Sequence, residues 1–403
     1  MKITIFTMND PLEGKDGGGK RLLKMIDYLS RFADVRVAVP RARWSHPQRD
    51  MVLVQIGKVK FFYLSMSSIG RFVNTFVITL ERKVKLPHGL LSNMLSLAYY
   101  DPKVATFLRE ISLDNDVLQS EFNWSISIPN RIAKKLRIPH VHTAHDIMTY
   151  WYMPENSFVN RMLKAILLSI ESHKLSKVNA LIFLSKLDYS IAEKVMGLTN
   201  VEKWIIPNGA DESILRIIRN PAKDEVLFVG SSHFPNVEAA AFILHEIAPK
   251  LPNIKFIIIG SVCYDLPKLG DIPTNVKLKG VVSDAELFEM YARATVGIIP
   301  LKRGSGMKVK ITELLSAGIP TITTIVGSEG LDVINGKEVI IENNMTKFPE
   351  WIKKLVNDDE FNRLLSENGR KHVMKLTWDR ALETYIHVYN KLRSKYIETY
   401  SPS

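Results

Sequence analysis

The sequence predicts an α/β protein with two doubly wound parallel sheets, each in its own domain. Strand-like and helix-like segments alternate from the first residues onward, and a second alternating series begins at Glu225. The length of 403 residues is sufficient for two domains. We expect one domain at residues 1–210, another at residues 211–376, and a terminal helix at residues 377–403 that returns to the first domain.

The first domain opens with a strand, a helix and a second strand. Strand Lys2–Phe6 is followed by three glycines, a helical pattern at Lys20–Phe32 and an apolar strand at Val35–Val39. The glycines at 17–19 are expected to form a tight turn with positive φ. Further strands are expected at residues 117–118, 140–143, 180–184 and 204–206.

The second domain repeats this alternation. Its first strand, Glu225–Gly230, precedes a helical pattern from Asn236 to about Leu251 and a buried strand at Ile254–Ile259. Strands then follow at residues 276–278, 295–299 and 321–324, with helices at residues 284–293 and 308–317. Apolar residues recur at helical spacing from Trp378 to Leu392 and predict the terminal helix.

Composition excludes several classes of protein. Cys263 is the one cysteine, so an intramolecular disulfide and a multi-cysteine metal site are excluded. No apolar run is long enough to span a bilayer, and the first residues read as a strand, so we expect a cytoplasmic protein. The net charge of +12 favours anionic partners. Zinc-finger spacings and RNA-binding signatures are absent, so nucleic acid is not expected.

The most informative segment is the glycine-rich run from Gly304 to Glu313. It follows an apolar strand and leads into a helix, so its free backbone N–H groups suit a phosphate or diphosphate. Lys308 and Lys310 add positive charge, and the carboxylate of Glu313 is placed to accept from sugar or ribose hydroxyls. The segment therefore predicts a nucleotide-binding site, although solvated lysines at an ordinary helix start would give the same pattern.

A second candidate site follows the strand at residues 140–143. His145 and Asp146 lie at its carboxyl end, where open α/β sheets bind ligands. His140 and His142 share one strand face, so a metal site is not expected there. A purely structural histidine at position 145 remains an alternative.

Several of these segments together resemble one family, the GT-B glycosyltransferases, and within it the retaining group 1 enzymes of family 4. The matching segments are residues 207–209, 228–239, 280–287, 304–313 and 326–331. The resemblance implies two Rossmann-like domains that face each other across a cleft, with the nucleotide sugar held mainly by the second.

The resemblance also assigns roles to individual residues. Catalytic roles fall on His145, Lys310 and Glu313. Donor binding falls on Gly18, Gly19, Ser231, His233, Arg303, Gly304, Ser305, Gly306, Met307, Lys308, Lys310 and Glu313. Asp146 is assigned to the acceptor side. Trp151 and Tyr152 are added as candidates for an acceptor groove because they are aromatic, with packing in the core as the alternative.

Two departures from the family pattern concern the donor. Many members have a glutamate at the position of Ser305, where it contacts the donor sugar. Many also have an arginine and a lysine after the first strand of the second domain, where this chain has Ser231, Ser232 and His233. The grip on the phosphates is therefore expected to rely on Lys308, Lys310 and Arg303.

The expected activity is transfer of a hexose-type unit from a nucleoside diphosphate sugar to a glycan or lipid-linked acceptor, with retention. No cofactor or metal is expected, because no aspartate-x-aspartate motif is present. The alternatives are a nucleotide-sugar epimerase or hydrolase on the same fold, and a non-catalytic basic module that binds nucleic acid or a membrane. The base, the sugar, the acceptor and the oligomeric state do not follow from the sequence.

The segment from Lys58 to Lys85 bears on whether the protein contacts a membrane. Between Lys58 and Lys85, apolar residues recur at helical spacing and basic residues flank them. The apolar positions are Ile69, Phe72, Val73, Phe76, Val77 and Leu80. This pattern is typical of a helix that packs on its own sheet, and it also fits a helix lying on an anionic membrane surface.

Overall fold

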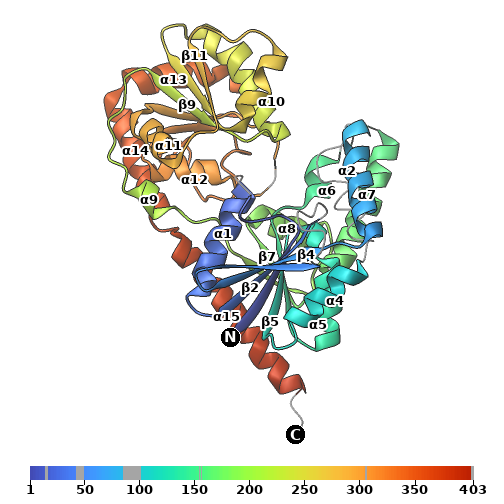
Figure 1. Cartoon of the computed structure of the whole chain (residues 1–403). Coiled ribbons are helices and arrows are strands. Elements are labelled where there is room, and N and C mark those ends of the chain that lie inside the picture. Colours follow the sequence, from blue (N-terminus) through green and yellow to red (C-terminus); the bar gives the residue numbers. More distant parts are fainter. Residues whose placement is uncertain are drawn as a thin grey trace. The chain divides into compact units, whose positions relative to one another are not determined.

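The computed structural model describes residues 1–13, 17–41, 50–84, 101–153, 155, 157–304 and 306–400. The chain forms two compact units, one of Met1–Pro207 with Leu382–Ser403 and one of Asn208–Ala381. Both are α/β units built on a parallel sheet, as the sequence predicts (Figure 1). The chain returns to the first unit at Leu382, within the terminal helix.

The first unit contains an eight-stranded sheet with the order β3-β4-β2-β1-β5-β6-β7-β8. All neighbouring strands are parallel except β3 and β4. The strands are β1 (Lys2–Thr7), β2 (Asp34–Arg41), β3 (Met51–Ile56), β4 (Val59–Ser65), β5 (Val117–Glu121), β6 (His140–Ala144), β7 (Ala180–Phe183) and β8 (Glu202–Ile205). Every residue of β5, β6 and β7 is buried, as expected for parallel strands covered on both faces.

The first unit also contains helices, some of which pack on the two faces of this sheet. They are α1 (Gly17–Ser30), α2 (Ser68–Val84), α4 (Pro102–Ile111), α5 (Ser127–Leu136), α6 (Met148–Tyr152), α7 (Phe158–Leu175), α8 (Lys186–Lys194), α15 (Trp378–Tyr400) and the short η1 (Asn123–Ser125). Leu118 of β5 belongs to the core cluster formed with α4 and α5. The next residue, Gln119, bonds Tyr389 of α15. Because successive strand residues point to opposite faces, α15 lies on the face opposite α4 and α5.

The glycine run at the start of α1 corrects one prediction. Gly18 and Gly19 lie in the first helical turn, and neither has a positive φ, so the expected tight turn is wrong. The helix also starts before the apolar periodicity that the sequence shows. Glycine has no side chain that could take part in an apolar pattern, so such a pattern cannot mark a helix start at these residues.

The segment after β2 forms a hairpin, and the helix predicted from the spacing of Ile69 to Leu80 is confirmed by α2 (Ser68–Val84). Val59–Ser65 forms the buried strand β4, paired with β3 through a turn at Gly57, whose φ is 57°. The basic residues Lys58 and Lys60 therefore belong to this hairpin, and the helix begins only at Ser68. Lys85 lies outside the described residues.

The second unit contains a six-stranded sheet, parallel throughout, with the order β11-β10-β9-β12-β13-β14. The strands are β9 (Glu225–Val229), β10 (Lys255–Ile259), β11 (Val276–Gly280), β12 (Val296–Ile299), β13 (Thr321–Thr323) and β14 (Ile340–Ile341). The strands that follow β9 in the sequence are first added on one side of it, as β10 and β11, and then on its other side, as β12, β13 and β14. The strand order therefore reverses next to β9. The carboxyl ends of these strands are where such sheets bind ligands.

The helices of the second unit are α9 (Glu212–Leu215), α10 (Phe234–Phe242), α11 (Asp284–Arg293), α12 (Val309–Ser316), α13 (Phe348–Asn357) and α14 (Asp359–Val373). The helix predicted from residue 236 corresponds to α10 and changes its helix type towards its carboxyl end. A π-helical turn η2 (Ile243–Ile247) and the 3-10 turn η3 (Ala248–Lys250) continue α10. Further 3-10 turns are η4 (Ser261–Tyr264), η5 (Leu266–Leu269) and η6 (Met345–Lys347).

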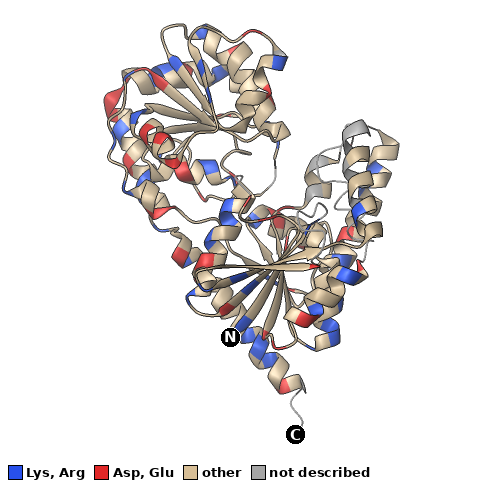
Figure 2. Ribbon diagram, viewed as in Figure 1, with Lys and Arg blue, Asp and Glu red and all other residues tan. Residues whose placement is uncertain are grey.

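Charged residues are spread over both units. Figure 2 shows Lys and Arg interspersed with Asp and Glu along the helices of each unit.

A close backbone contact generates the first prediction. A Cβ atom at Gly209 would lie 2.3 Å from the Trp378 backbone, because the chains around Ala210 and Thr377 run side by side. Gly209→Ala should therefore destabilise the second unit by about 1–3 kcal/mol through overpacking. Thermal unfolding of the variant should begin several degrees below that of the wild type.

The matched control for this variant is Gly336→Asn. Gly336 has a φ of 79° with nothing within 4 Å of an added Cβ, and asparagine tolerates that conformation. An equal loss of thermal stability in both variants would contradict the close contact at Gly209.

Candidate active site

The glycine-rich loop of the second unit follows β12 and leads into α12. Gly304 and Gly306 have φ angles of 144° and 63°, which side chains rarely adopt. Lys308 precedes the helix with extended backbone, and its side chain does not cap the helix. The amino terminus of α12 therefore lies at the carboxyl edge of the sheet, as the sequence predicts. Ser305 lies outside the described residues.

Lys308 and Arg303 are neutralised within the unit. Nζ of Lys308 donates to Gly306 O at 2.6 Å and lies 3.4 Å from Oε2 of the buried Glu329. Arg303 donates through Nε and a terminal nitrogen to the two carboxylate oxygens of Glu238, each at 3.1 Å. Both cations lie on the loop that precedes α12, but each already has a carboxylate partner.

Lys310 differs from these two cations. Its Nζ donates to Oδ1 of Asn236 at 2.6 Å and lies 4.7 Å from the centre of the Phe228 ring. Among the described residues, no carboxylate lies within ion-pair distance of this amine. Burial, with repulsion from Lys308, lowers the pKa of Lys310 to about 7, while Glu313 opposes this shift.

Asn236 is a residue that sequence reasoning missed. Its Oδ1 accepts from Lys310, and its Nδ2 donates to the carbonyl and the hydroxyl of Ser231, both at 3.1 Å. Asn236 therefore connects the loop after β9 with the start of α12. The signal that the sequence did contain is the position of Asn236 in the first turn of α10, two residues after Phe234, where a polar side chain lies close to the preceding loop. His233 precedes the same helix without capping it, and its side chain is exposed.

Glu313 faces the interior of the second unit. The residue is 9% exposed, and its Oε2 accepts from the hydroxyl of Tyr291 at 3.0 Å. Burial, followed by the charge of Glu313, raises the pKa of Tyr291 well above its usual value, so this hydroxyl remains a donor. Tyr291, on α11, was not predicted, and a hydrogen bond donated by a ribose hydroxyl to Glu313 stays a prediction.

Met307 is a packing residue of the loop. It is 6% exposed, its carbonyl accepts from Nδ2 of Asn208 at 3.2 Å, and its side chain packs against Gly330. A Cβ at Gly330, where φ is 88°, would lie 2.6 Å from Cβ of Met307. The loop is therefore held in place by the turn at Asn208 and by the glycine that follows Glu329.

An open cavity of about 440 Å³ lies beside this loop at the carboxyl ends of β12 and β13. Its lining includes Lys302, Thr324, Asn343 and Met345. A Cβ at Gly304 would lie 4.0 Å from Val326, which also lines the cavity, so the glycine-rich loop adjoins it. The volume is in the range of small-molecule sites.

In the first unit, His145 follows β6 and is fixed on two sides. Its Nε2 lies 2.7 Å from Oε2 of Glu121, whose side chain is 1% exposed. Its ring stacks on Phe122 with centroids 3.8 Å apart. Phe122 has a φ of 66°, which is rare for a bulky residue, and such backbone strain clusters at functional sites. Glu121 was not predicted from the sequence.

The other predicted residues of the first unit have contacts within it. The carbonyl of Asp146 accepts from Nδ2 of Asn123 at 3.0 Å. Trp151 is half-buried against a core cluster, and its indole N–H donates to Asp188 at 3.0 Å. The side chain of Tyr152 lies outside the described residues. Roles of these residues toward an acceptor stay predictions.

His140 and His142 are joined by a serine and do not converge on a metal position. Oγ of Ser120 lies 2.8 Å from Nε2 of His140 and 2.7 Å from Nδ1 of His142. Burial lowers the pKa of His140 to about 3, so its ring is neutral. Within the described part of the chain, no group of three His, Cys, Asp or Glu side chains is arranged to hold a metal ion.

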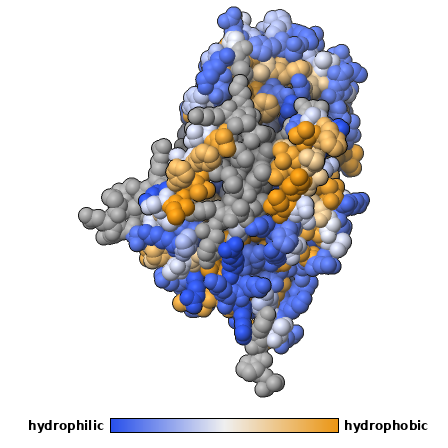
Figure 3. Space-filling model, turned by 90° about the vertical axis from the view of Figure 1, so that its right-hand side faces the viewer, coloured by the Kyte–Doolittle hydropathy of each residue, from blue (hydrophilic) through white to orange (hydrophobic). Residues whose placement is uncertain are grey.

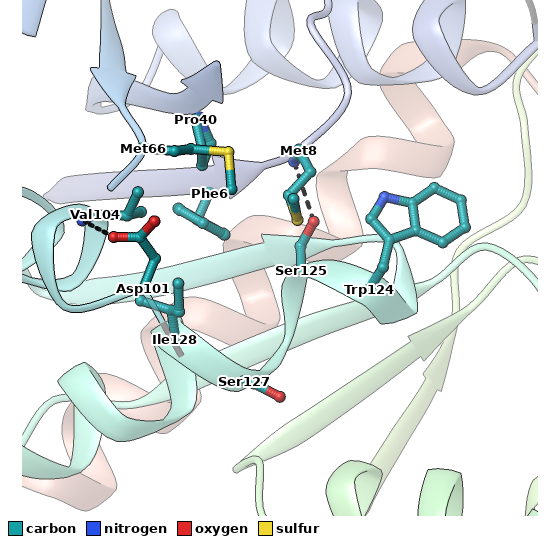
Figure 4. Close-up of a pocket in the computed structure, with 10 residues that line it drawn as sticks. All are labelled: Phe6, Met8, Pro40, Met66, Asp101, Val104, Trp124, Ser125, Ser127 and Ile128. Carbon is teal, nitrogen blue, oxygen red and sulfur yellow. Dashed lines mark hydrogen bonds between the residues drawn. The ribbon is translucent and has the colours of Figure 1, made fainter. Parts of the chain in front are cut away.

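A small apolar cavity of about 30 Å³ lies at the carboxyl edge of the first sheet (Figure 4). Phe6, Met8, Pro40, Met66 and Ile128 contribute its apolar lining. The carboxylate of Asp101 lies at its side and caps α4 through the backbone N–H groups of residues 103 and 104. Its size fits about one methyl group or one water molecule.

Two family models match the chain. The model described as Glycosyltransferase Family 4 matches residues 15–214, and the model described as Glycosyl transferases group 1 matches residues 223–358. Each unit is therefore matched by one of them. The group 1 match includes β9, the glycine-rich loop and Lys310.

Two curated proteins show weak similarity over most of the chain. An uncharacterised 44.6 kDa protein of the cps region of Klebsiella pneumoniae is 25% identical over 373 residues, which cover 87% of this chain and 90% of that protein. An uncharacterised glycosyltransferase of Methanocaldococcus jannaschii is 24% identical over 283 residues, which cover 69% of this chain and 76% of that protein.

Solved structures share the fold across the whole chain. Sucrose-phosphate synthase from Thermosynechococcus elongatus has a TM-score of 0.71 at 16% identity and covers 98% of this chain and 99% of its own. Anabaena HepE in complex with UDP-glucose has a TM-score of 0.67 at 12% identity, with coverages of 96% and 99%. An Escherichia coli structure described as trehalose-6-phosphate bound with UDP-2-fluoro glucose has a TM-score of 0.67 at 12% identity, with coverages of 98% and 99%.

The titration of Lys310 generates the second prediction. Its folded-state pKa of about 7 lies below that of a lysine in an unfolded chain. Between the two values the unfolded protein binds more protons, so the free energy of unfolding rises with pH. Between pH 7 and about pH 9.5, the free energy of unfolding of the wild type should rise by on the order of 2 kcal/mol relative to that of Lys310→Met.

Urea unfolding of both proteins at the two pH values measures this gain. Lys302→Met, which removes an exposed lysine of the preceding loop, is the matched control. A stability difference between wild type and Lys310→Met that does not change with pH would contradict an enclosed amine at position 310.

Proposed function

Because the chain is a GT-B glycosyltransferase of the group 1 type, we propose that it transfers a hexose-type unit from a nucleoside diphosphate sugar to a glycan or lipid-linked acceptor, with retention of configuration. The observation that carries this proposal is the amine of Lys310, which lies at the start of α12 without a carboxylate partner among the described residues. A diphosphate at this helix start would supply the missing negative charge.

The donor is proposed to bind the second unit through the glycine-rich loop. Gly304 and Gly306 lack side chains, so a phosphate can approach the backbone of the loop. Lys310 would contact the diphosphate and stabilise the negative charge that develops on the leaving group. A bound diphosphate favours the charged form of the amine, so binding near pH 7 would be accompanied by proton uptake.

The mechanism proposed is displacement on one face of the sugar. Retention by double displacement uses two carboxylates about 5 Å apart. The buried carboxylates described above, Glu121, Glu313 and Glu329, are each engaged by a neighbouring side chain. The leaving phosphate is therefore proposed to accept the proton of the attacking hydroxyl, while the protein supplies positioning and positive charge. Metal independence remains part of the proposal.

Binding of nucleotides tests the donor site and gives the third prediction. One of UDP, GDP, ADP and TDP should raise the thermal unfolding temperature. At a hundredfold excess over Kd, the bound nucleotide should add about 2.7 kcal/mol to the free energy of unfolding. UDP is tested first because HepE binds UDP and UDP-glucose in its solved structures. Lys310→Met should remove most of this stabilisation, whereas Lys353→Met, which changes an exposed lysine of α13 outside the cavity lining, should retain it.

The alternatives appear as distinct outcomes of the same test. Stabilisation by none of the four nucleotides, together with binding to polyanions, would indicate a non-catalytic basic module. A protein that binds a nucleotide and converts the nucleotide sugar without any acceptor would be an epimerase or hydrolase.

An exposed apolar face of the first unit supports a lipid-linked acceptor. On α2, Ile69 and Phe72 are each 71% exposed, and Phe76 is 54% exposed. On α7, a second exposed stripe includes Phe158, Val159, Met162, Leu163, Ile166 and Ile170. Figure 3 shows apolar surface gathered on the side of the molecule that carries these helices.

We define these nine residues of α2 and α7 as the apolar face and propose that it contacts an anionic membrane. No helix of the described residues combines the length and the apolar character that crossing a bilayer requires. The net charge of +12 favours anionic lipids, and aromatic side chains on such a face suit the headgroup region. Contact with the membrane would bring the enzyme to a lipid-linked acceptor.

Vesicle sedimentation gives the fourth prediction. Vesicles that contain phosphatidylglycerol should sediment the wild-type protein, and neutral phosphatidylcholine vesicles should bind it more weakly. The double variant Phe72→Asp and Phe76→Asp should lose about tenfold or more in binding, because it places charge in the acyl boundary. Leu113→Asp, at a residue of the same unit that is 62% exposed, should bind like the wild type. Equal binding by both variants would contradict the contact.

A further inference from the structure

A chain of buried polar side chains connects the terminal helix with His145. The hydroxyl of Tyr389 on α15 bonds Oε1 of Gln119, and Nε2 of Gln119 bonds Oε1 of Glu121. The other oxygen of Glu121 lies 2.7 Å from Nε2 of His145. Tyr389, Gln119 and Glu121 are fully buried, so water does not compete for these hydrogen bonds.

The donors and acceptors along this chain have one consistent direction. A carboxylate only accepts, so Gln119 must present its Nε2 to Glu121 and its Oε1 to Tyr389. The hydroxyl of Tyr389 is then the donor to that oxygen. Burial raises the pKa of Tyr389 well above its usual value, which keeps the proton on the hydroxyl. The orientation of the Gln119 amide therefore depends on a side chain of α15.

A second tyrosine of α15 holds the opposite side of the same amide. The hydroxyl of Tyr385 lies 3.0 Å from Oγ1 of Thr143, which in turn lies 3.3 Å from Nε2 of Gln119. Arg21 of α1 donates to that hydroxyl at 3.3 Å and to the carbonyl of Ile206 at 2.8 Å. The terminal helix is thus fixed to the sheet at two adjacent polar positions.

His145 has little freedom at the other end of the chain. Glu121 holds its Nε2, and the ring of Phe122 lies against one of its faces at a centroid distance of 3.8 Å. Nδ1 is consequently the ring nitrogen that can act toward a substrate. A change in the position of the Glu121 carboxylate would change both the tautomer and the direction of that nitrogen.

We propose that Tyr389 and Gln119 are positioning residues for His145, acting through Glu121, and that α15 is therefore part of the catalytic arrangement of the first unit. This inference rests on the proposed function only in that His145 acts in the transfer reaction. Tyr389 and Gln119 have no proposed contact with a substrate, because both are fully buried.

The experiment compares Tyr389→Phe and Gln119→Leu with Tyr396→Phe, which makes the same chemical change further along α15. Ring ¹⁵N signals of His145, identified with a His145→Gln variant, report its tautomer without any substrate. They should shift in the first two variants and not in the control. Transferase assays should show kcat reduced roughly tenfold, with the donor KM changed much less. Nucleotide stabilisation of the second unit should be unchanged.

The outcomes separate this inference from the proposed function. Unchanged ring signals in Tyr389→Phe overturn the connection, whatever the activity. Shifted signals with an unchanged kcat show that the connection exists without serving the reaction, which also overturns the inference. An inactive wild type contradicts the proposed function instead, and a His145→Gln variant with full activity contradicts the catalytic role that the family resemblance assigns to His145. A variant that fails to fold is identified by its thermal unfolding, and Gln119→Leu then provides the independent second test.

Discussion

The donor half of the proposed site depends on a positive charge that the protein leaves without a counter-charge. The amine of Lys310 is held by an amide oxygen and an aromatic ring, and the described residues provide it with no carboxylate partner. Lys308 and Arg303, on the same loop, are both paired. Removing an unpaired ammonium from water is unfavourable, which is why its pKa is low. An anionic ligand would remove this penalty, which supports the proposed donor site.

The first unit has the opposite arrangement at the corresponding edge of its sheet. Glu121 is a buried carboxylate at the carboxyl end of β5, and His145 and Gln119 supply its partners. Each unit thus has an ionisable side chain near the carboxyl edge of its parallel strands, Lys310 at the start of α12 and Glu121 at the end of β5. Such edges collect functional groups because the strand backbones fix their positions, while the loops beyond them can vary. The strained backbone of Phe122 lies at this same edge.

The sequence predicted the sheets well because a parallel strand buried on both faces is a continuous apolar run. The strands at β1, β9, β10 and β12 were therefore visible. The hairpin of β3 and β4 was not, because β3 is exposed and its residues show no alternation. The start of α1 was misjudged for a related reason, since glycines carry no pattern and only backbone hydrogen bonds define that turn. Periodicity reports side-chain burial, so it fails where burial does not decide the structure.

The candidate site shows the same division between local and tertiary information. The glycine-rich loop and Lys310 were predictable because they are contiguous in the sequence and their chemistry is local. Asn236 and Glu121 were missed, because each gains its meaning from a partner on another element. The extreme case is Tyr389, which lies 270 residues from Gln119 in the chain and bonds it directly. In the sequence, Tyr389 is recognisable only as one of the apolar residues that recur at helical spacing in the terminal helix. Only the fold brings its hydroxyl to Gln119, and a contact between residues so far apart in the chain leaves no local signature in the sequence.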